Sequence, residues 1–285
     1  MTRPTQPTPT RVLIAIDSSP GSRRAIPVGS GLASAFDVPV SGFPVASDDQ
    51  RRAEIEAVVA TQHAELELEP GSDDSVSSGT VADLIATADR RQALVIAAIP
   101  SVRRRNRRAR PFGYPMAATS PAPWLAVGPK MRRPRGVRPN QLVVPLDGSS
   151  AAAALVPTAL SWARAFGLVV QLIAVVPSAP PPLRPPTVPN PRQRFTMDPE
   201  HHMSALLVHQ PADAKVKTEV LPDPIGLASA MEHRLRDEPE NIVLAPSRRG
   251  FDYRSFIDGA STDSLLRASP VPVLLVPDPP PPQAR

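Results

Sequence analysis

The chain has 285 residues, enough for one large domain or two ordinary ones. It contains 39 prolines and no cysteine, which excludes disulfide bonds, thiolate catalysis and cysteine-based zinc sites. The formal net charge is +5, but residues 103–138 hold ten arginines and one lysine with no acid, so that the rest of the chain carries −6. The positive charge therefore belongs to one segment and not to the folded bodies.

Targeting and membrane segments are not predicted. The first apolar run, residues 12–16, is too short for the core of a signal peptide. No apolar run approaches the roughly 20 residues that a membrane-spanning helix needs. We therefore expect a soluble, cytoplasmic protein that does not contact membranes.

An internal repeat organises the chain. Three apolar segments of the first half return in the same order in the second half. They pair as 11–17 with 141–147, 94–101 with 242–247, and 121–127 with 270–276. The offset grows from 130 residues at the paired aspartates to 149 at the last segment, because the second half carries a proline-rich insertion.

Each half alternates short runs rich in Val, Ile and Leu with stretches of helical period, which predicts parallel strands covered by helices. In the first half we predict strands at 11–16, 38–45, 64–68, 93–99 and 123–127, and helices at 20–36, 48–62, 79–91 and 112–119. In the second half we predict strands at 141–146, 168–176, 215–221, 241–245 and 272–276, and helices at 150–166, 199–210, 224–237 and 261–269.

The predicted fold class is α/β, with two five-stranded, Rossmann-like parallel sheets in tandem. The predicted parts are a disordered tail at 1–10, a first domain at 11–129, a basic linker at 130–139, a second domain at 140–278 with an extended insertion at 178–191, and a disordered tail at 279–285. Proline fixes the backbone and cannot donate hydrogen bonds, which is why the insertion is expected to be an extended loop.

An aspartate ends the first strand of each half, at Asp17 and Asp147. In open parallel sheets the ligand crevice lies beyond the carboxyl ends of the strands. The sequence Asp147-Gly148-Ser149 fits a tight turn into a capped helix. It also fits a carboxylate that accepts a hydrogen bond from a ribose hydroxyl or an adenine amine, and both interpretations stay open.

A second candidate loop follows the fourth strand of the second half. It contains Ser247, Arg248, Arg249 and Gly250, and it ends in Gly259, Ala260, Ser261 and Thr262. The glycines would let the backbone approach a phosphate, the arginines would neutralise its charge, and a hydroxyl could cap the next helix. A glycine-containing surface loop without a ligand is the alternative.

These features together resemble the universal stress protein family. The likeness rests on the strand followed by Asp147-Gly148-Ser149, on a strand that ends Ala174-Val175-Val176-Pro177, on the loop at 247–250, and most specifically on residues 259–276. It covers nearly the whole chain as two copies. The resemblance implies a five-stranded parallel fold of the adenine nucleotide alpha hydrolase-like type in each copy, and two copies joined through their last strands as an intramolecular pseudo-dimer.

In the ATP-binding branch of that family, a Gly-x2-Gly-x9-Gly-Ser/Thr motif holds the phosphates. Carried over, Asp147 would face the ribose or adenine, the backbone of Val175 would contact adenine, and Gly250 and Gly259 would be the second and third glycines. Ser247 stands where the first glycine belongs, eight residues instead of nine separate the later glycines, and Ala260 takes the Ser/Thr place.

The first half lacks the motif glycines, and Pro44 stands at the position of Val175. The resemblance therefore implies that ATP, with Mg²⁺, binds only in the second half and that the first site is degenerate. The alternative is a structural or interaction module that has kept the fold and lost the ligand. A homodimer of whole chains stays open.

The remaining features do not define an active site. The arginine-rich loop at 103–110 is interpreted as a solvated charged segment, with binding to an anionic polymer such as nucleic acid as the alternative. Adjacent histidines at 201 and 202 point in different directions on a helix, so we predict no metal site there. No hydrolase motif is present, and we name no catalytic residue; slow ATP hydrolysis is the most we expect.

Overall fold

The structure is a computed structural model of the full chain. It describes residues 8–17, 19, 21–46, 48–63, 65–69, 80–99, 116, 119–131, 138–177, 198–208, 214–223, 226–247 and 261–277. Residues 1–7 and 279–285 of the predicted tails, the insertion at 178–191 and the arginine-rich loop at 103–110 lie outside these residues. The tail predicted at 1–10 is too long, because the Thr10 amide donates to the Gln92 carbonyl at 3.0 Å. Within the described ranges, no helix combines the length and the apolar character that crossing a membrane requires.

The first half alternates strands and helices. Its elements are β1 (Arg11–Ile16), α1 (Ser22–Phe36), β2 (Val40–Pro44), α2 (Asp49–Gln62), α3 (Val81–Arg90), β3 (Ala93–Ala98) and β4 (Trp124–Val127). Every strand lies within one or two residues of its prediction, apart from the expected strand at 64–68. Of the expected helix at 112–119, only residues 116 and 119 are described, and both are helical.

The second half repeats the pattern. Its elements are β5 (Gln141–Leu146), α5 (Ser150–Ala153), α6 (Val156–Phe166), β6 (Val169–Pro177), α7 (Pro199–Leu207), β7 (Val216–Asp223), α8 (Leu227–Arg234), β8 (Asn241–Ser247), α9 (Ser261–Ala268) and β9 (Val273–Pro277). The helix predicted at 150–166 is divided into α5 and α6. Pro157 cannot donate to the carbonyl one turn before it, and it lies instead in the first turn of α6, where no such bond is needed.

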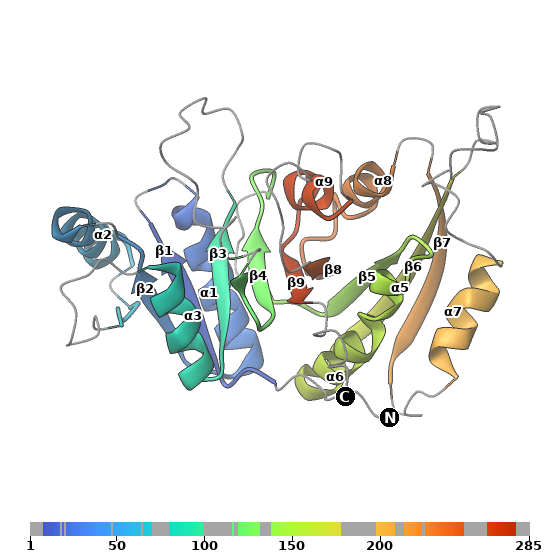
Figure 1. Ribbon diagram of the computed structural model, residues 1–285, viewed down its shortest axis with the longest axis horizontal. Coiled ribbons are helices and arrows are strands. Elements are labelled where there is room, and N and C mark those ends of the chain that lie inside the picture. Colours follow the sequence, from blue (N-terminus) through green and yellow to red (C-terminus); the bar gives the residue numbers. More distant parts are fainter. Residues whose placement is uncertain are drawn as a thin grey trace, which may run out of the picture.

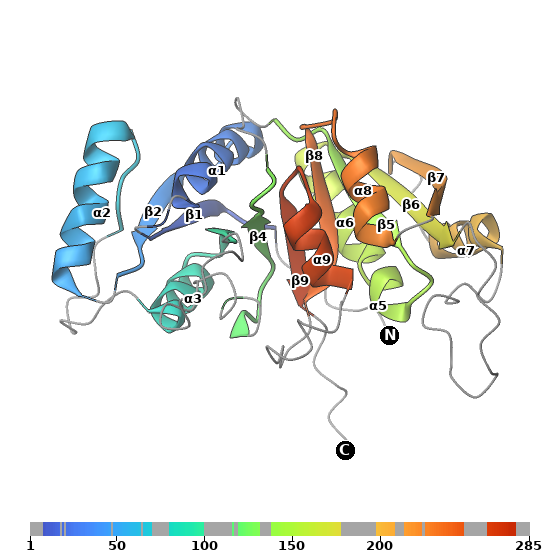
Figure 2. The same cartoon turned by 90° about the horizontal axis from the view of Figure 1, so that it is seen from above.

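All strands in the described part of the chain belong to one sheet, in the order β2-β1-β3-β4-β9-β8-β5-β6-β7. Among these strands, neighbours are parallel within each half, and β4 and β9, which join the halves, are antiparallel to each other. Figures 1 and 2 show the halves side by side, with β4 and β9 in the middle and β2 and β7 toward the ends. The two halves are therefore joined through their last strands, as expected.

The prediction of two five-stranded sheets is therefore correct only in part. The second half contributes five parallel strands, but the first contributes four, and residues expected as a strand at 64–68 form a single bridge between Leu68 and Gly42. Gly42 donates to Glu67 and accepts from Glu69, each at 2.8 Å. After Gly42, Pro44 is the next residue of β2 whose backbone points away from β1. Pro44 has no N–H and so cannot continue the hydrogen bonding to residues 64–68.

The helices bury both faces of the sheet. One core cluster contains side chains of α1, α2, α6 and α7, and the other contains side chains of α3, α8 and α9, each together with alternate residues of the strands. A sheet covered in this way has only its two edges and the ends of its strands open to ligands. We therefore expect a ligand site at the carboxyl ends of the strands.

Candidate functional site

The central strand of the second half, β5, has β6 on one side and β8 on the other. The chain passes from β5 to β6 and β7, and only later returns to β8 and β9, so the strand order reverses between β5 and β8. The two strands pair over Gln141–Val143 and Asn241–Val243, although β5 continues to Leu146 and β8 to Ser247. Their carboxyl ends thus separate at the point where open α/β sheets hold their ligands.

Asp147 follows directly after β5. Its Oδ1 accepts a hydrogen bond from the Ser149 amide at 3.0 Å, and Gly148 supplies the positive φ of 78° that this turn requires. The Ser149 hydroxyl then accepts from the Ala152 amide at 3.2 Å and caps α5. The turn-and-cap interpretation is therefore confirmed, and a ligand contact of the carboxylate stays a prediction.

Val175 lies near the end of β6, and its side chain is 6% exposed within the core. The backbone groups of every second residue of β6 point toward β5. Val169 is one of these residues, because its amide donates to the Asn140 carbonyl at 3.0 Å. Val175 is in phase with Val169 and stands one residue beyond the last β5 pair, Leu146 with Ala174. Its backbone is therefore directed toward the segment that Asp147 begins.

Ser247 ends β8 and is 4% exposed. Ser261 begins α9, and the Thr262 hydroxyl donates to the Pro246 carbonyl at 3.2 Å, which attaches the first turn of α9 to the end of β8. The structure thus brings Ser247 and the start of α9 to the carboxyl ends of the strands, where Asp147 also lies. Arg248, Arg249, Gly250, Gly259 and Ala260 lie outside the described residues.

A buried carboxylate in the first turn of α9 was missed by the sequence analysis. Asp263 is 4% exposed and forms an ion pair with Arg267, Nε to Oδ2, at 3.0 Å. Burial raises the pKa of Asp263, and the hydrogen bond and charge of Arg267 act in the opposite direction. The spacing of an acid and a base four residues apart on a predicted helix is the signal that could have found this pair.

The first half has an aspartate at the equivalent position, and protein groups bind it closely. The Asp17 Oδ1 accepts from the Ser22 hydroxyl and from the Ser19 amide, the latter at 2.9 Å. The Asp17 amide in turn donates to the Ser22 hydroxyl at 2.9 Å. At the 130-residue offset the counterpart of Ser22 is Ala152, which has no hydroxyl. The hydroxyl that binds Asp17 therefore has no counterpart at the equivalent position of the second half.

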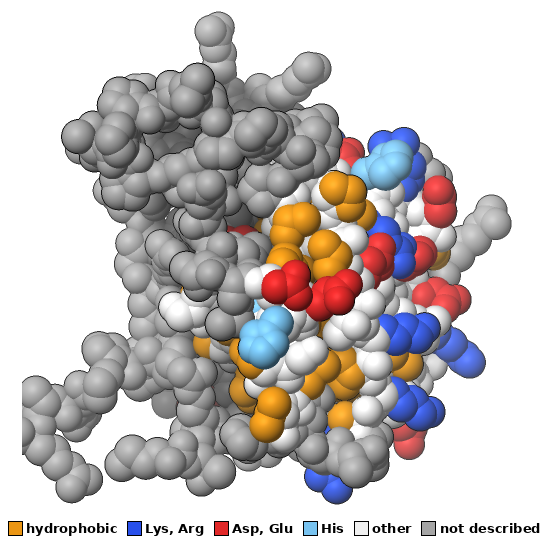
Figure 3. Space-filling model, turned by 90° about the vertical axis from the view of Figure 1, so that its right-hand side faces the viewer, with side chains coloured by type: hydrophobic (Ala, Val, Ile, Leu, Met, Phe, Trp, Pro, Cys, Tyr) orange, Lys and Arg blue, Asp and Glu red, His pale blue; other side chains and the backbone are white. Residues whose placement is uncertain are grey.

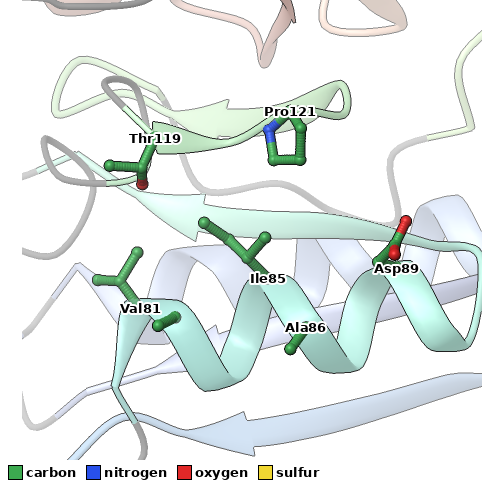
Figure 4. A pocket seen from close by; sticks show the side chains of 7 residues that line it. Val81, Ile85, Ala86, Asp89, Thr119 and Pro121 are labelled. Carbon is green, nitrogen blue, oxygen red and sulfur yellow. The ribbon is translucent and has the colours of Figure 1, made fainter.

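A hollow of about 680 Å³ lies elsewhere in the first half, between α3 and the segment that leads into β4 (Figure 4). It is lined by Val81, Ala82, Ile85, Ala86, Asp89, Thr119 and Pro121. Its described walls are mainly apolar, and no arginine or lysine is among them. This hollow does not match the charge of a nucleotide phosphate.

Comparison with known proteins identifies relatives of this chain. Residues 140–277 match the family model of the universal stress protein family. No curated protein matches the sequence significantly.

Two solved structures share the fold over nearly the whole chain. A universal stress protein from Archaeoglobus fulgidus DSM 4304 has a TM-score of 0.57 and 14% sequence identity, and the match covers 95% of this chain and 97% of that one. A protein of unknown function from Pseudomonas aeruginosa PAO1 has a TM-score of 0.50 and 12% identity, with 94% and 92% covered. At such identities the likeness concerns the fold alone.

Proposed function

The chain belongs to the universal stress protein family through residues 140–277, and on this premise we propose that its second half binds ATP, as the Mg²⁺ complex, at the carboxyl ends of β5 and β8. The observation that carries the proposal is the separation of these two strands beyond Val143 and Val243. The separation lies at the reversal of strand order, between Asp147 and Ser247. Ligands of open α/β sheets bind at this kind of position.

The adenosine would lie at the ends of β5 and β6. There the Asp147 carboxylate would accept from a ribose hydroxyl or the adenine amine, and the backbone of Val175 would contact the base. The direction of the Val175 backbone toward β5 supports this assignment. Gly148 and Ser149 would fix the position of Asp147, because they form and cap the turn that holds its carboxylate.

The polyphosphate would lie at the end of β8 and the start of α9. Backbone amides at Ser247, Gly250, Gly259 and Ala260, together with Ser261, would surround the phosphates, while Arg248 and Arg249 would neutralise their charge. The attachment of Thr262 to Pro246 supports this assignment, since it places the N-terminus of α9 against the end of β8. An oriented helix N-terminus favours anions.

The first half would serve as a packing partner that does not bind the nucleotide. The Ser22 hydroxyl already donates to the Oδ1 atom of Asp17, and a ligand that binds this atom would have to displace it. A protein group that is left without its partner costs about as much free energy as the ligand contact would return. This difference gives the experiment an internal control.

Calorimetric titration of Mg-ATP into the full chain tests the proposal, with Asp147→Ala and Asp17→Ala as matched variants. Loss of one charge-assisted hydrogen bond predicts an affinity at least about tenfold weaker for Asp147→Ala and unchanged affinity for Asp17→Ala. Equal losses in both variants would contradict the assignment to the second half.

A structural or interaction module without a nucleotide is the second candidate. It is favoured by the buried Ser247 at the position of the first motif glycine, because a side chain there occupies space that the motif leaves open. Absence of saturable heat at millimolar Mg-ATP, in a chain whose circular dichroism shows the native fold, would select this second function.

A further inference from the structure

The strand β7 forms one edge of the nine-stranded sheet. It pairs with β6 over all eight of its residues, and no other described strand pairs with it. An edge of this length presents a row of backbone donors and acceptors that another strand can bind. Figure 3 shows the side of the molecule toward which β7 and α7 lie, where hydrophobic side chains gather between acidic and basic ones.

The register of β6 and β7 fixes which residues of β7 face outward. The Val170 amide donates to the Lys215 carbonyl at 2.9 Å, and Val170 is the register partner of Val216. In a parallel ladder, Val170 then binds the residues on either side of Val216, and the backbone groups of Val216 itself point away from β6. The same holds for Thr218, Val220 and Pro222, which follow at intervals of two.

The side chains of β7 divide between the two faces of the sheet. Val216 packs against the core cluster that also contains Met203 of α7, and Val220, which is 37% exposed, lies on the same face. Lys217 and Glu219 lie on the opposite face, where Arg234 of α8 binds Glu219. The strand thus has two valines on one face and two opposite charges on the other, arranged symmetrically about Thr218.

We propose that a second copy of this chain pairs with β7 in antiparallel orientation, with the two-fold axis at Thr218. The outward backbone groups of Val216, Thr218 and Val220 would then all have partners: Thr218 would pair with itself, and Val216 would pair with Val220 of the other copy. On one face the valines would lie opposite each other, and on the other face each Lys217 would lie opposite a Glu219. Such cross-strand pairs stabilise antiparallel sheets.

Moving the two-fold axis to a neighbouring residue of β7 places like charges opposite each other or loses a backbone hydrogen bond. An axis at Lys217 would set two lysines opposite each other, and an axis at Glu219 would do the same with two glutamates. An axis at Val220 would place Thr218 opposite Pro222, which has no N–H to donate. Of these registers, the axis at Thr218 alone pairs Val216, Thr218 and Val220 with one another and matches the charges. Pro222, the remaining outward residue of β7, then lies beyond the paired valines.

The opposite edge of the sheet explains why assembly would stop at two copies. There the bridge between Gly42 and Leu68 covers part of β2, and Pro44 interrupts the rest. The interface would use the same strand in both copies, which closes a dimer and does not continue into a filament. The dimer does not depend on nucleotide binding, because β7 carries none of the proposed ATP contacts.

Sedimentation equilibrium of the full chain over a concentration series measures the proposed dimer. Lys217→Glu would replace two opposite-charge contacts with two like-charge contacts, and we expect the dimer Kd to rise about tenfold. Arg23→Glu is the matched control, because Arg23 is an exposed cation on α1 in the other half of the chain. That variant should keep the Kd of the parent protein.

Residue-resolved amide exchange provides a readout that does not require a variant. Dimer formation should protect the Val216, Thr218 and Val220 amides in a concentration-dependent way, whereas the Lys217 and Glu219 amides, which face β6, should be protected at every concentration. A chain that stays monomeric at millimolar concentration overturns the proposal. So does a dimer in which these three amides exchange as fast as in the monomer, or one that Lys217→Glu leaves unchanged.

Discussion

Phe36 and Phe166 stack across the junction of the two halves, with ring centroids 3.8 Å apart and ring planes 17° apart. They are separated by the same 130 residues as the paired aspartates, and each is the last residue of its helix. The next residues, Asp37 and Gly167, both have left-handed backbone conformations. Equivalent helix ends, shaped in the same way, therefore meet each other in the folded chain.

The stacked rings predict an energetic coupling between the halves. Phe36→Ala and Phe166→Ala should each lower the free energy of unfolding by about 2 to 3 kcal/mol, because each removes a large side chain from the junction. The double variant should lose about 1 kcal/mol less than the sum of the two, since the ring pair is lost only once. Chemical denaturation followed by circular dichroism measures all three values.

The control for this cycle is Phe43→Ala, which removes a buried phenyl ring from the other core cluster. Its effect should add to that of Phe166→Ala without coupling. Equal coupling energies in the two cycles would contradict a specific role of the stacked pair.

A second prediction concerns Gly128, which follows β4 and touches α9 of the other half. A Cβ atom at this position would lie 2.5 Å from the Leu266 carbonyl oxygen, and a backbone atom cannot rotate away. Gly128→Ala should therefore lower the free energy of unfolding by about 1 to 3 kcal/mol.

Gly29→Ala is the matched comparison in thermal or chemical unfolding. There a Cβ would lie 2.5 Å from both the Cδ1 and the Cγ1 atoms of Ile14, which belong to a side chain and can shift further than a backbone carbonyl. Alanine also favours helix by up to about 1 kcal/mol over glycine. We expect this variant to stay within about 1 kcal/mol of the parent, and a larger loss than in Gly128→Ala would refute the distinction.

A third prediction concerns Glu69, whose side chain is 5% exposed. Arg91 Nη2 lies 2.8 Å from Oε2, Arg11 Nη1 lies 3.2 Å from Oε1, and the Ser41 hydroxyl donates to Oε1 at 2.7 Å. Glu69→Gln leaves two arginines without their anion, but their side chains are 31% and 41% exposed, so that water reaches them. We expect a loss of about 2 kcal/mol.

Amide exchange shows whether this loss is local. The Glu69 and Gly42 amides, which hold the bridge at the β2 edge, should exchange faster in Glu69→Gln. Glu67→Gln changes an exposed residue of the same segment and should leave both amides as they are. Unchanged exchange in Glu69→Gln would show that the carboxylate does not fix this segment.

The fold followed from the sequence wherever repetition and period agreed. The segments at 11–16 and 141–146 were predicted as equivalent first strands with the bounds that β1 and β5 have, because both the apolar run and the following aspartate recur. The contact between Phe36 and Phe166 could not be predicted, since a repeat identifies equivalent positions but not how two copies face each other. The strand expected at 64–68 does not form beyond one bridge because Pro44, in a different part of the chain, has no N–H to pair with it.

The candidate site was predicted less completely. Asp147 and Ser149 were placed correctly in a turn and a cap, because their chemistry is local. Asp263 was missed, since its burial depends on how α9 packs and cannot be read from the local sequence. The proposed contacts of Arg248, Arg249 and Gly250 stay predictions, as these residues lie outside the described part of the chain.

The last prediction concerns the pH dependence of stability and a network of polar side chains around Glu219 and Glu238 in the second half. Gln171 donates to Glu219 at 2.6 Å, Arg234 donates to both Glu219 and Glu238, and Asn241 donates to Glu238 at 2.7 Å. Burial alone would raise the pKa of Glu238, but the hydrogen bonds from Arg234 and Asn241, with the nearby positive charges, hold it below its usual value.

A carboxyl whose pKa is lower in the folded state stabilises the fold above its ordinary pKa, about 4.3 for glutamate, and this contribution is lost as the pH falls through the folded value. The free energy of unfolding of Glu238→Gln should therefore fall less than that of the parent between neutral and acid pH. At neutral pH the variant should be less stable than the parent. Urea unfolding at a series of pH values measures the slope. Glu54→Gln, an exposed residue of α2, should keep the parent slope; equal slopes in all three proteins would show that Glu238 does not contribute to acid unfolding.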